Sequence, residues 1–345
     1  MNKFKEKLKL FSLSVTAIPI ISVIVLILLI FIFSDTPVKT MYFFFLGPFR
    51  NIFNIGNLLN SMVPLIFGAL GIIIAMKAGS LNLGGEGQIY FGAFITLITA
   101  LSLVSFGVFG MIIAFLAGAL ASGSVAAISG ICKAKWNTNE LITTFLMSCA
   151  IIPIVNYLIT GPFLDPQTSL VSTKKIAENM RLSFILKPSS LNTGFFISLV
   201  FVYGVNIFLN KTRPGYEFRM IGFNDMFARY GGINVKLNTI FSLALSGCLY
   251  GIAGSIAVLG THHAVIKEFS AGLGWSGLTV ALIANFSPVG VIPCAFFLAW
   301  INTGARLAMQ NTGLTYEIVY IVQAVIFLLA TSLFIRNLMN KKRKI

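Results

Sequence analysis

The sequence is short of charge, and above all of acid. Only 10% of its 345 residues are charged, and ten Asp and Glu stand against 25 Lys and Arg, whereas soluble domains carry roughly 25% charged residues. This composition excludes an ordinary soluble globular domain. A net charge of +15 would suggest nucleic-acid binding in a soluble chain. Here the basic residues gather between apolar runs, as they do in membrane-protein loops, so we expect a lipid bilayer and no nucleic acid as partner.

Motifs for bond chemistry are also scarce. The chain has no G-x-x-x-x-G-K-[ST] sequence, so it does not supply its own ATP site of that type. The adjacent His262 and His263 would point about 100° apart on a helix, which is poor geometry for chelating one metal. The cysteines lie in or beside apolar runs without the spacing of metal ligands, and they are Cys132, Cys149, Cys248 and Cys294. We expect no metal, no bound cofactor and no enzymatic activity.

Long apolar runs are what the chain does have. They are about 17–25 residues long, the length that a helix needs to cross a bilayer, whereas the strands of a membrane barrel would alternate in short segments. We predict one all-α transmembrane domain over residues 1–345, located in the cell membrane. Ten spans are expected, at about 12–33, 60–77, 88–106, 109–131, 139–160, 191–210, 239–260, 272–286, 289–308 and 315–335.

The distribution of basic residues predicts the orientation. Most lysines and arginines fall on one side if both termini are cytoplasmic, which favours an N-in, C-in topology with an even number of spans. Two glycine-rich breaks, at 78–92 and at 271–288, interrupt the apolar pattern. Corresponding blocks five spans apart would run in opposite directions, so we predict an inverted repeat with broken helices and a transport path at the repeat interface.

The stretch Met76–Gly92 carries the first candidate site, because irregular backbone survives in lipid only where protein or a water-filled cavity surrounds it. It contains Asn82, Glu86 and Gln88, which are candidates for the substrate path. Glu86 has two possible roles. It could bind sugar hydroxyls or base edges by charge-assisted hydrogen bonds, or it could accept backbone N–H groups and hold the glycine-rich turn.

The second break carries two matching candidates for the path, Trp275 and Asn285. The indole of Trp275 could stack on a purine or pyrimidine, a contact worth about 1–3 kcal/mol per base in nucleic-acid sites. The alternative is a tryptophan of the interfacial aromatic belt.

A polar loop at 211–238 is expected on the cytoplasmic face. Asn224 or Asp225 can cap a short helix, Met226–Tyr230, which Gly231-Gly232 then ends. A capped helix between glycines suits docking onto a partner, although a solvated loop would show the same charges. Glu140 begins the fifth span at the same face, where it either caps the helix or couples to that partner.

Four blocks of sequence resemble one family. They are KAGSLNLGGEGQIYFGA (77–93), TNELITTFLM (138–147), GYEFRMIGFNDMFARYGGI (215–233), and the pair SGCLYGIAGSIAVLG (246–260) with GLGWSGLTVALIANFSPVG (272–290). Together they make the chain similar to permease subunits of ABC importers, in the simple-sugar and nucleoside (branched-chain-type) branch, and most like nucleoside permeases. Asp225, Phe227 and Gly231 depart from the usual cytoplasmic motif of this family.

This resemblance implies a set of partners. The chain would form half of a pore with an identical or related permease, an extracytoplasmic binding protein would deliver a nucleoside, and ATP would be hydrolysed by a partner subunit. That ATPase would dock on the cytoplasmic motif, at Arg219, Gly222, Asn224, Ala228, Arg229, Tyr230 and Gly232. A simple-sugar or autoinducer permease and an ion-coupled secondary transporter are the alternatives. The sparse intramembrane acids disfavour the second, and the lack of a convergent His, Asp and Ser set disfavours an intramembrane enzyme.

Overall fold

The computed structural model describes residues 2–313, 315 and 317–342. Within these residues the chain is helical and contains only isolated β-bridges in its loops, so the prediction of an all-α protein is confirmed. The α-helices are α1 (Asn2–Phe33), α2 (Pro37–Met41), α3 (Ile52–Lys77), α4 (Gly85–Ser102), α5 (Gly107–Trp136), α6 (Glu140–Thr160), α7 (Gly194–Lys211), α8 (Arg213–Phe223), α9 (Asp225–Tyr230), α10 (Val235–Ile256), α11 (Leu273–Ile283), α12 (Val291–Thr312) and α13 (Glu317–Lys342). Two π-helical turns, η1 (Tyr42–Leu46) and η5 (Ala257–His262), follow α2 and α10.

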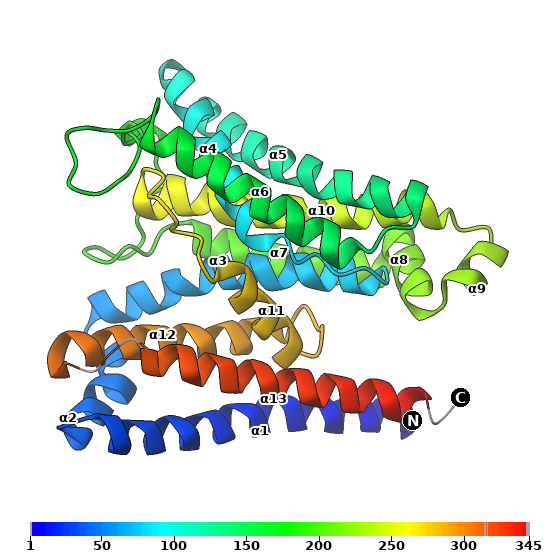
Figure 1. Cartoon of the computed structure of the whole chain (residues 1–345), viewed down its shortest axis with the longest axis horizontal. Coiled ribbons are helices and arrows are strands. Elements are labelled where there is room, and N and C mark those ends of the chain that lie inside the picture. The colour runs from blue at the N-terminus through cyan, green and yellow to red at the C-terminus, as the bar shows by residue number, and fades with distance from the viewer. Residues whose placement is uncertain (1, 314, 316, 343–345) are drawn as a thin grey trace.

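The long helices run roughly along one direction (Figure 1). The start of α1, the end of α13 and the short helices α8 and α9 lie at one end of the molecule, which we call the terminal end. Helix α2 and the loop 161–193 lie at the opposite end, the loop end. Among the described residues, six helical segments are long and apolar enough to cross a membrane: Ile52–Lys77, Val104–Trp136, Glu140–Thr160, Gly194–Lys211, Val235–His262 and Val291–Thr312.

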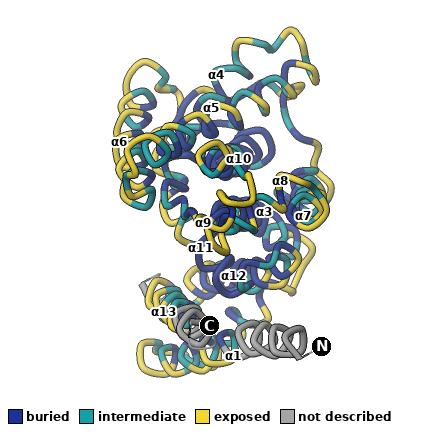
Figure 2. The backbone as a smooth tube through the Cα atoms, turned by 90° about the vertical axis from the view of Figure 1, so that its right-hand side faces the viewer, coloured by how far each residue is buried: buried dark blue, intermediate teal, exposed yellow. Residues whose placement is uncertain are grey.

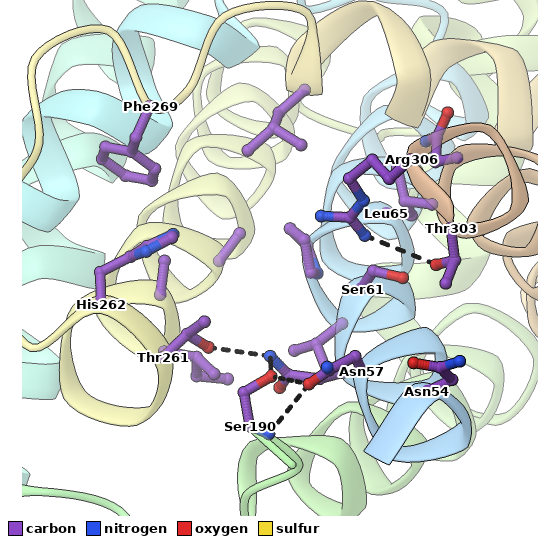
Figure 3. A pocket seen from close by; sticks show the side chains of 18 of the residues that line it. Asn54, Asn57, Ser61, Leu65, Ser190, Thr261, His262, Phe269, Thr303 and Arg306 are labelled. Carbon is purple, nitrogen blue, oxygen red and sulfur yellow. Dashed lines mark hydrogen bonds between the residues drawn. The ribbon is translucent and has the colours of Figure 1, made fainter. Parts of the chain in front are cut away.

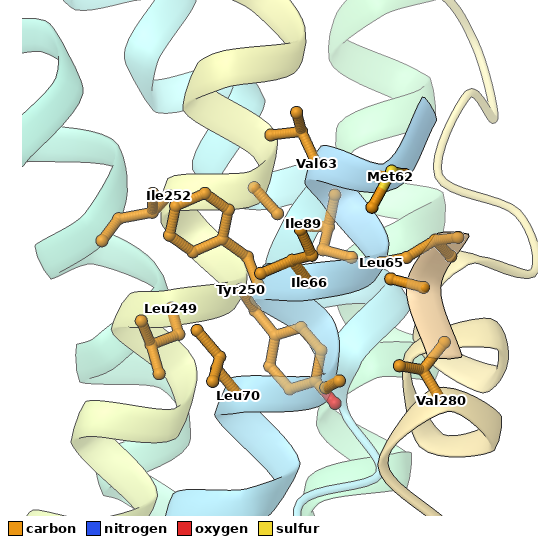
Figure 4. Packing of buried hydrophobic residues seen from close by; sticks show 14 of the residues in the cluster. Met62, Val63, Leu65, Ile66, Leu70, Ile89, Leu249, Tyr250, Ile252 and Val280 are labelled. Carbon is orange, nitrogen blue, oxygen red and sulfur yellow. The ribbon is translucent and has the colours of Figure 1, made fainter. Parts of the chain in front are cut away.

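Helices α3 and α10 form the core. In the most apolar stretch of each, 83% and 78% of residues are buried, against 22% in α5, and both lie at the centre when the molecule is viewed along its helices (Figure 2). The two helices are antiparallel, because Asn60 lies beside Thr261 and Gly71 lies beside Ser246. Figure 4 shows Tyr250 of α10 packed among apolar residues of α3. Since both helices are buried on nearly every side, they set the position of the elements around them.

Small residues allow α10 to approach its neighbours closely, as membrane helices require where apolar surface alone drives no association. A β-carbon at Gly251 would lie 2.5 Å from the carbonyl oxygen of Gly118 in α5 and 2.8 Å from the Cα of Ala119. Gly247 meets the carbonyl oxygen of Ser122 in the same way, also at 2.5 Å. Glycine is therefore required at 247 and 251 because the backbones of α10 and α5 are in contact there, and not because the chain turns.

Replacing Gly251 by alanine should lower the free energy of unfolding by about 1–3 kcal/mol or more, because the added methyl group overlaps backbone atoms that cannot move aside. The matched control is Gly204→Ala in α7, where a β-carbon would meet nothing within 4 Å. That change should be neutral or slightly stabilising, since alanine is the better helix former. Thermal unfolding of the purified variants in detergent measures both, and equal melting temperatures would contradict the packing described for α10.

Each predicted span overlaps a helix, but the boundaries differ at two informative places. Helix α3 begins at Ile52, capped by Asn51, about eight residues before the predicted span. The predicted span at 272–286 is the 11-residue helix α11, whose length of about 17 Å is roughly half of a bilayer core. The region 34–59, which had suggested one short interfacial helix, contains α2, two further short helical turns and the start of α3.

Candidate functional site

Two non-helical segments enter the helix bundle from opposite ends (Figure 1). The first connector, residues 78–84, leads from α3 at the terminal end to the start of α4. The second connector, residues 263–272, leads from η5 at the loop end to the start of α11. They meet where Gly272 donates its backbone N–H to a carboxylate oxygen of Glu86. The two glycine-rich patterns of the sequence therefore mark two half-buried chain crossings.

Glu86 lies in the first turn of α4, next to the first turn of α11. Backbone N–H groups at a helix N-terminus favour negative charge, and here the carboxylate lies in the first turn of α4 and accepts the N–H of Gly272 at the start of α11. A β-carbon at Gly274 would lie only 2.8 Å from the backbone nitrogen of Glu86, so the two helix starts are in direct contact. The acceptor role considered for Glu86 had it bond N–H groups of its own glycine-rich turn, whereas the N–H bonded here belongs to Gly272 of the second connector.

Asn82 and Gln88 bond to each other at the end of the first connector. The Asn82 amide nitrogen donates to the Gln88 side-chain oxygen over 2.8 Å, and Gln88 donates back over 3.1 Å. Asn82 also bonds to Ser246 of α10 and accepts the N–H of Gly84. Both amides are buried and neither lines a described cavity, so they hold the connector against α10.

Trp275 and Asn285 lie near opposite ends of α11, and Trp275 directly follows Gly274, which contacts Glu86. Trp275, near the start of α11, is 44% exposed and packs edge-on against Phe327 of α13, with ring centres 6.3 Å apart. Asn285 occupies the turn after α11 in a left-handed conformation, with φ of 49°. Of the five predicted path residues, Asn82 and Gln88 bond to each other, Trp275 lies beside the Gly274–Glu86 contact, and Asn285 lies just beyond the other end of α11.

A cavity of about 610 Å³ lies instead at the loop end, between α3, α10 with η5, α12 and the second connector. Its polar lining consists of Asn54, Asn57, Asn60, Ser61, Ser190, Thr261, His262, Asn302, Thr303, Arg306 and Gln310. Figure 3 shows His262 and Phe269 on one side of this cavity and Arg306 with Ser61 and Leu65 on the other. Its volume is that of a small-molecule site.

Three asparagines of α3 line this cavity, which the sequence analysis did not predict. Asn54, Asn57 and Asn60 recur at three-residue spacing in an otherwise apolar segment, so they follow one side of the helix. Asn60 donates to Ser190 and Thr261, and Asn57 accepts two hydrogen bonds from Ser190. Amides at this spacing in an apolar run were the signal that could have located the cavity.

The formal charge of the described cavity lining is positive. None of the described residues that line it is acidic, and Arg306 contributes a guanidinium whose closest described partner is the Thr303 hydroxyl at 3.5 Å. Arginine has five N–H donors and no acceptor, and asparagine and glutamine add both donors and acceptors. The lining can therefore hydrogen-bond a neutral or anionic ligand that is rich in acceptors, and it offers no counter-charge to a cation.

The predicted cytoplasmic motif forms helices α8 and α9 at the terminal end. Asn224 caps α9 by accepting the N–H of Phe227 over 3.0 Å, as the sequence indicated. Of the predicted docking residues, Arg219, Gly222, Asn224, Arg229, Tyr230 and Gly232 are exposed and Ala228 is buried. Tyr230 is 87% exposed, and Arg229 lies 3.9 Å from Asp225 in an exposed pair, so α9 presents both apolar and basic surface.

Glu140 does not cap its helix with its side chain. Asn139 does so, by accepting the N–H of Leu141 over 2.9 Å. The Glu140 carboxylate instead accepts from Lys133 over 2.7 Å, and the Lys133 ammonium also donates to Ser80 Oγ and to the carbonyl oxygen of Gly79 in the first connector. Gly79 in turn lies against Gly222 of α8, where a β-carbon would come within 3.3 Å of the Gly222 Cα.

Comparison with known proteins identifies the family of the chain. Residues 54–331 match the family described as branched-chain amino acid transport system, permease component. The chain belongs to this family. As a member, the permease is a multi-pass membrane protein, the transmembrane part of an ABC importer and not itself an ATPase. ATP is hydrolysed by a partner subunit, and a substrate-binding protein is the other usual component of such importers.

Several curated relatives cover most of the permease. It is 34% identical to a probable riboflavin import permease of Treponema pallidum, over 87% of this chain and 80% of the relative. It is 31% identical to the guanosine permease NupP of Bacillus subtilis, over 86% and 87%, and 26% identical to a glucose permease of Haloferax volcanii, over 87% and 82%. No solved structure matches the chain.

Proposed function

We propose that this permease imports a nucleoside and that the cavity at the loop end is its binding site. The observation that carries the proposal is the lining of that cavity, which combines several amides and one guanidinium with no described acid. Amides and hydroxyls suit the hydroxyl groups of a ribose, and a guanidinium suits the acceptor edge of a base. The guanosine permease among the relatives supports this choice.

The riboflavin and glucose permeases among the relatives define the competing substrates. Riboflavin shares the nucleoside pattern of a flat nitrogen heterocycle on a hydroxylated chain, whereas a sugar lacks the ring. The amide-rich lining would also bind a sugar, so a simple-sugar permease is the second candidate. The aromatic Phe269 at the cavity favours a ligand with a flat ring.

The topology that we propose has ten spans, with both termini in the cytoplasm, as an inverted repeat. Helices α3 and α10 correspond, each followed by a connector and a helix that starts inside the bundle. The antiparallel contact of α3 with α10 and the opposite entry of the two connectors support this. The terminal end would then be cytoplasmic, and the cavity would face the binding protein.

The working complex contains this chain, an identical or related second permease and two ATPase subunits. The ATPases dock on α8 and α9, through Arg219, Asn224, Arg229 and Tyr230. ATP binding closes the two ATPases, and this closure moves α8 against the first connector through the contact of Gly222 with Gly79. The permease then alternates access to the cavity between the two sides of the membrane.

Competition for uptake tests the substrate. Proteoliposomes carrying the complete importer and its binding protein would take up radiolabelled guanosine in the presence of ATP. We expect excess unlabelled nucleosides to block this uptake and excess glucose to leave it unchanged. Glucose uptake that guanosine does not compete with would overturn the nucleoside proposal and favour the sugar permease.

A further inference from the structure

The second connector forms one wall of the cavity and has an unusual backbone. Phe269 lines the cavity, as does Leu273 just after the connector. His263 and Glu268 have φ of 59° and 60°, a left-handed conformation that residues other than glycine rarely adopt. Such conformations persist only where surrounding contacts enforce them. The contacts that hold this segment therefore determine the shape of the cavity wall.

Residues 171–176 of the loop at the loop end hydrogen-bond the first half of the connector, at His263, Val265 and Lys267. Two side chains of α4 supply the contacts to its second half. The Tyr90 hydroxyl accepts the backbone N–H of Glu268 over 3.0 Å and donates to the Asn156 side-chain oxygen of α6 over 2.7 Å. Asn156 in turn donates to the Glu268 carboxylate over 3.2 Å. Four residues before Tyr90, Glu86 accepts the backbone N–H of Gly272. Because residues four apart lie on the same side of a helix, one side of α4 bonds the connector at two points.

The ring of Tyr90 also supports the aromatic part of the wall. It packs edge-on against Phe269 with ring centres 5.7 Å apart, and Phe269 lies 5.6 Å from the ring of His262. The hydroxyl and the ring of Tyr90 thus fix both the backbone and the side chain of the cavity wall. Neither Tyr90 nor Glu86 lines the cavity itself, so any effect on the ligand passes through the connector.

We infer that Glu86 and Tyr90 are positioning residues for transport, which hold the second connector so that Phe269 is presented to the ligand. This inference rests on the proposed function, because it takes the cavity to be the substrate site. Substrate affinity should then depend on two groups that do not contact substrate. Glu86 would act as an acceptor of a backbone N–H rather than as a ligand for the nucleoside.

Hydrogen exchange tests the positioning role without any substrate. In the assembled importer, Tyr90→Phe should speed exchange of the backbone amides in 264–272 by about three- to tenfold, the range expected for the loss of one hydrogen bond. Glu86→Ala should have an equal or larger effect. Glu86→Gln, which keeps an acceptor oxygen, should restore most of the protection. The matched control is Tyr157→Phe, a tyrosine of α6 that is 71% exposed and should leave exchange unchanged.

Uptake kinetics provide the second measurement. With guanosine as the probe, Tyr90→Phe should raise KM by about the same factor as it speeds exchange, with maximal rate and assembly preserved. Unchanged exchange in both Tyr90→Phe and Glu86→Ala would overturn the inference, as would faster exchange with an unchanged KM. If the unmodified importer takes up no guanosine, the nucleoside proposal fails, and the exchange measurement still decides whether α4 holds the connector.

Discussion

Replacing Arg306 by alanine should reduce kcat/KM for guanosine uptake by about 10- to 100-fold, since a guanidinium that pairs with a guanine edge discriminates by roughly 1–3 kcal/mol. Arg306 extends from α12 into the cavity, and none of the described lining residues carries a negative charge to pair with it. The guanidinium is therefore available to a ligand acceptor. Initial uptake rates over a range of guanosine concentrations measure the effect.

Two further variants identify the cause of that loss. Arg50→Ala removes an exposed arginine from the same end of the molecule, outside the cavity lining, and should leave uptake unchanged. Arg306→Lys keeps the charge but not the fork of donors, so it should weaken guanosine uptake while reducing the preference for guanosine over adenosine. Uptake that survives Arg306→Ala unchanged would exclude this cavity as the site of base recognition.

Exchanging Arg219 and Arg229 together for glutamate should detach the ATPase subunit and reduce uptake by on the order of tenfold or more, because reversed charge at a docking surface is repulsive as well as unpaired. Both arginines are exposed at the terminal end, and Arg229 shares α9 with the exposed Tyr230. Co-purification of the ATPase with the permease, measured beside uptake, reports the loss directly.

Lys211→Glu is the control for this exchange, because Lys211 is also basic and exposed at the end of α7 but precedes the docking helices. It should leave both the ATPase association and uptake near their original values. If the double exchange retained the ATPase and full uptake, α8 and α9 would be an ordinary solvated loop, the alternative that the charges alone permit.

The features that the sequence predicted correctly depend on local chemistry. Long apolar runs can only be buried as helices in a membrane, so the all-α class followed directly. Asn224 was recognisable as a helix cap because a short polar side chain before a helix satisfies free N–H groups. The glycine-rich stretch around Glu86 indicated either a tight crossing or part of the transport path, and in the structure Gly274 of α11 closely approaches the backbone of Glu86.

The asparagine spacing in α3 marks one wall of the cavity in the sequence, but the cavity as a whole could not be predicted in the same way, because its other walls come from distant segments. Asn57 of α3 and Arg306 of α12 line the same cavity only because the two helices pack together. Asn82 and Gln88 are predicted path residues because they are polar and lie between apolar runs, and in the structure they hydrogen-bond each other. Composition shows that a buried polar group needs a partner, but not whether that partner is protein or substrate.

The dependence of transport on the partner ATPase distinguishes an ATP-driven importer from an ion-driven carrier. Proteoliposomes containing the permease pair with its ATPase and binding protein should accumulate guanosine when ATP is supplied. Vesicles with the permease pair alone should accumulate none, with or without a Na⁺ or proton gradient. Accumulation by the permease alone under an ion gradient would instead identify a secondary transporter that needs no ATPase.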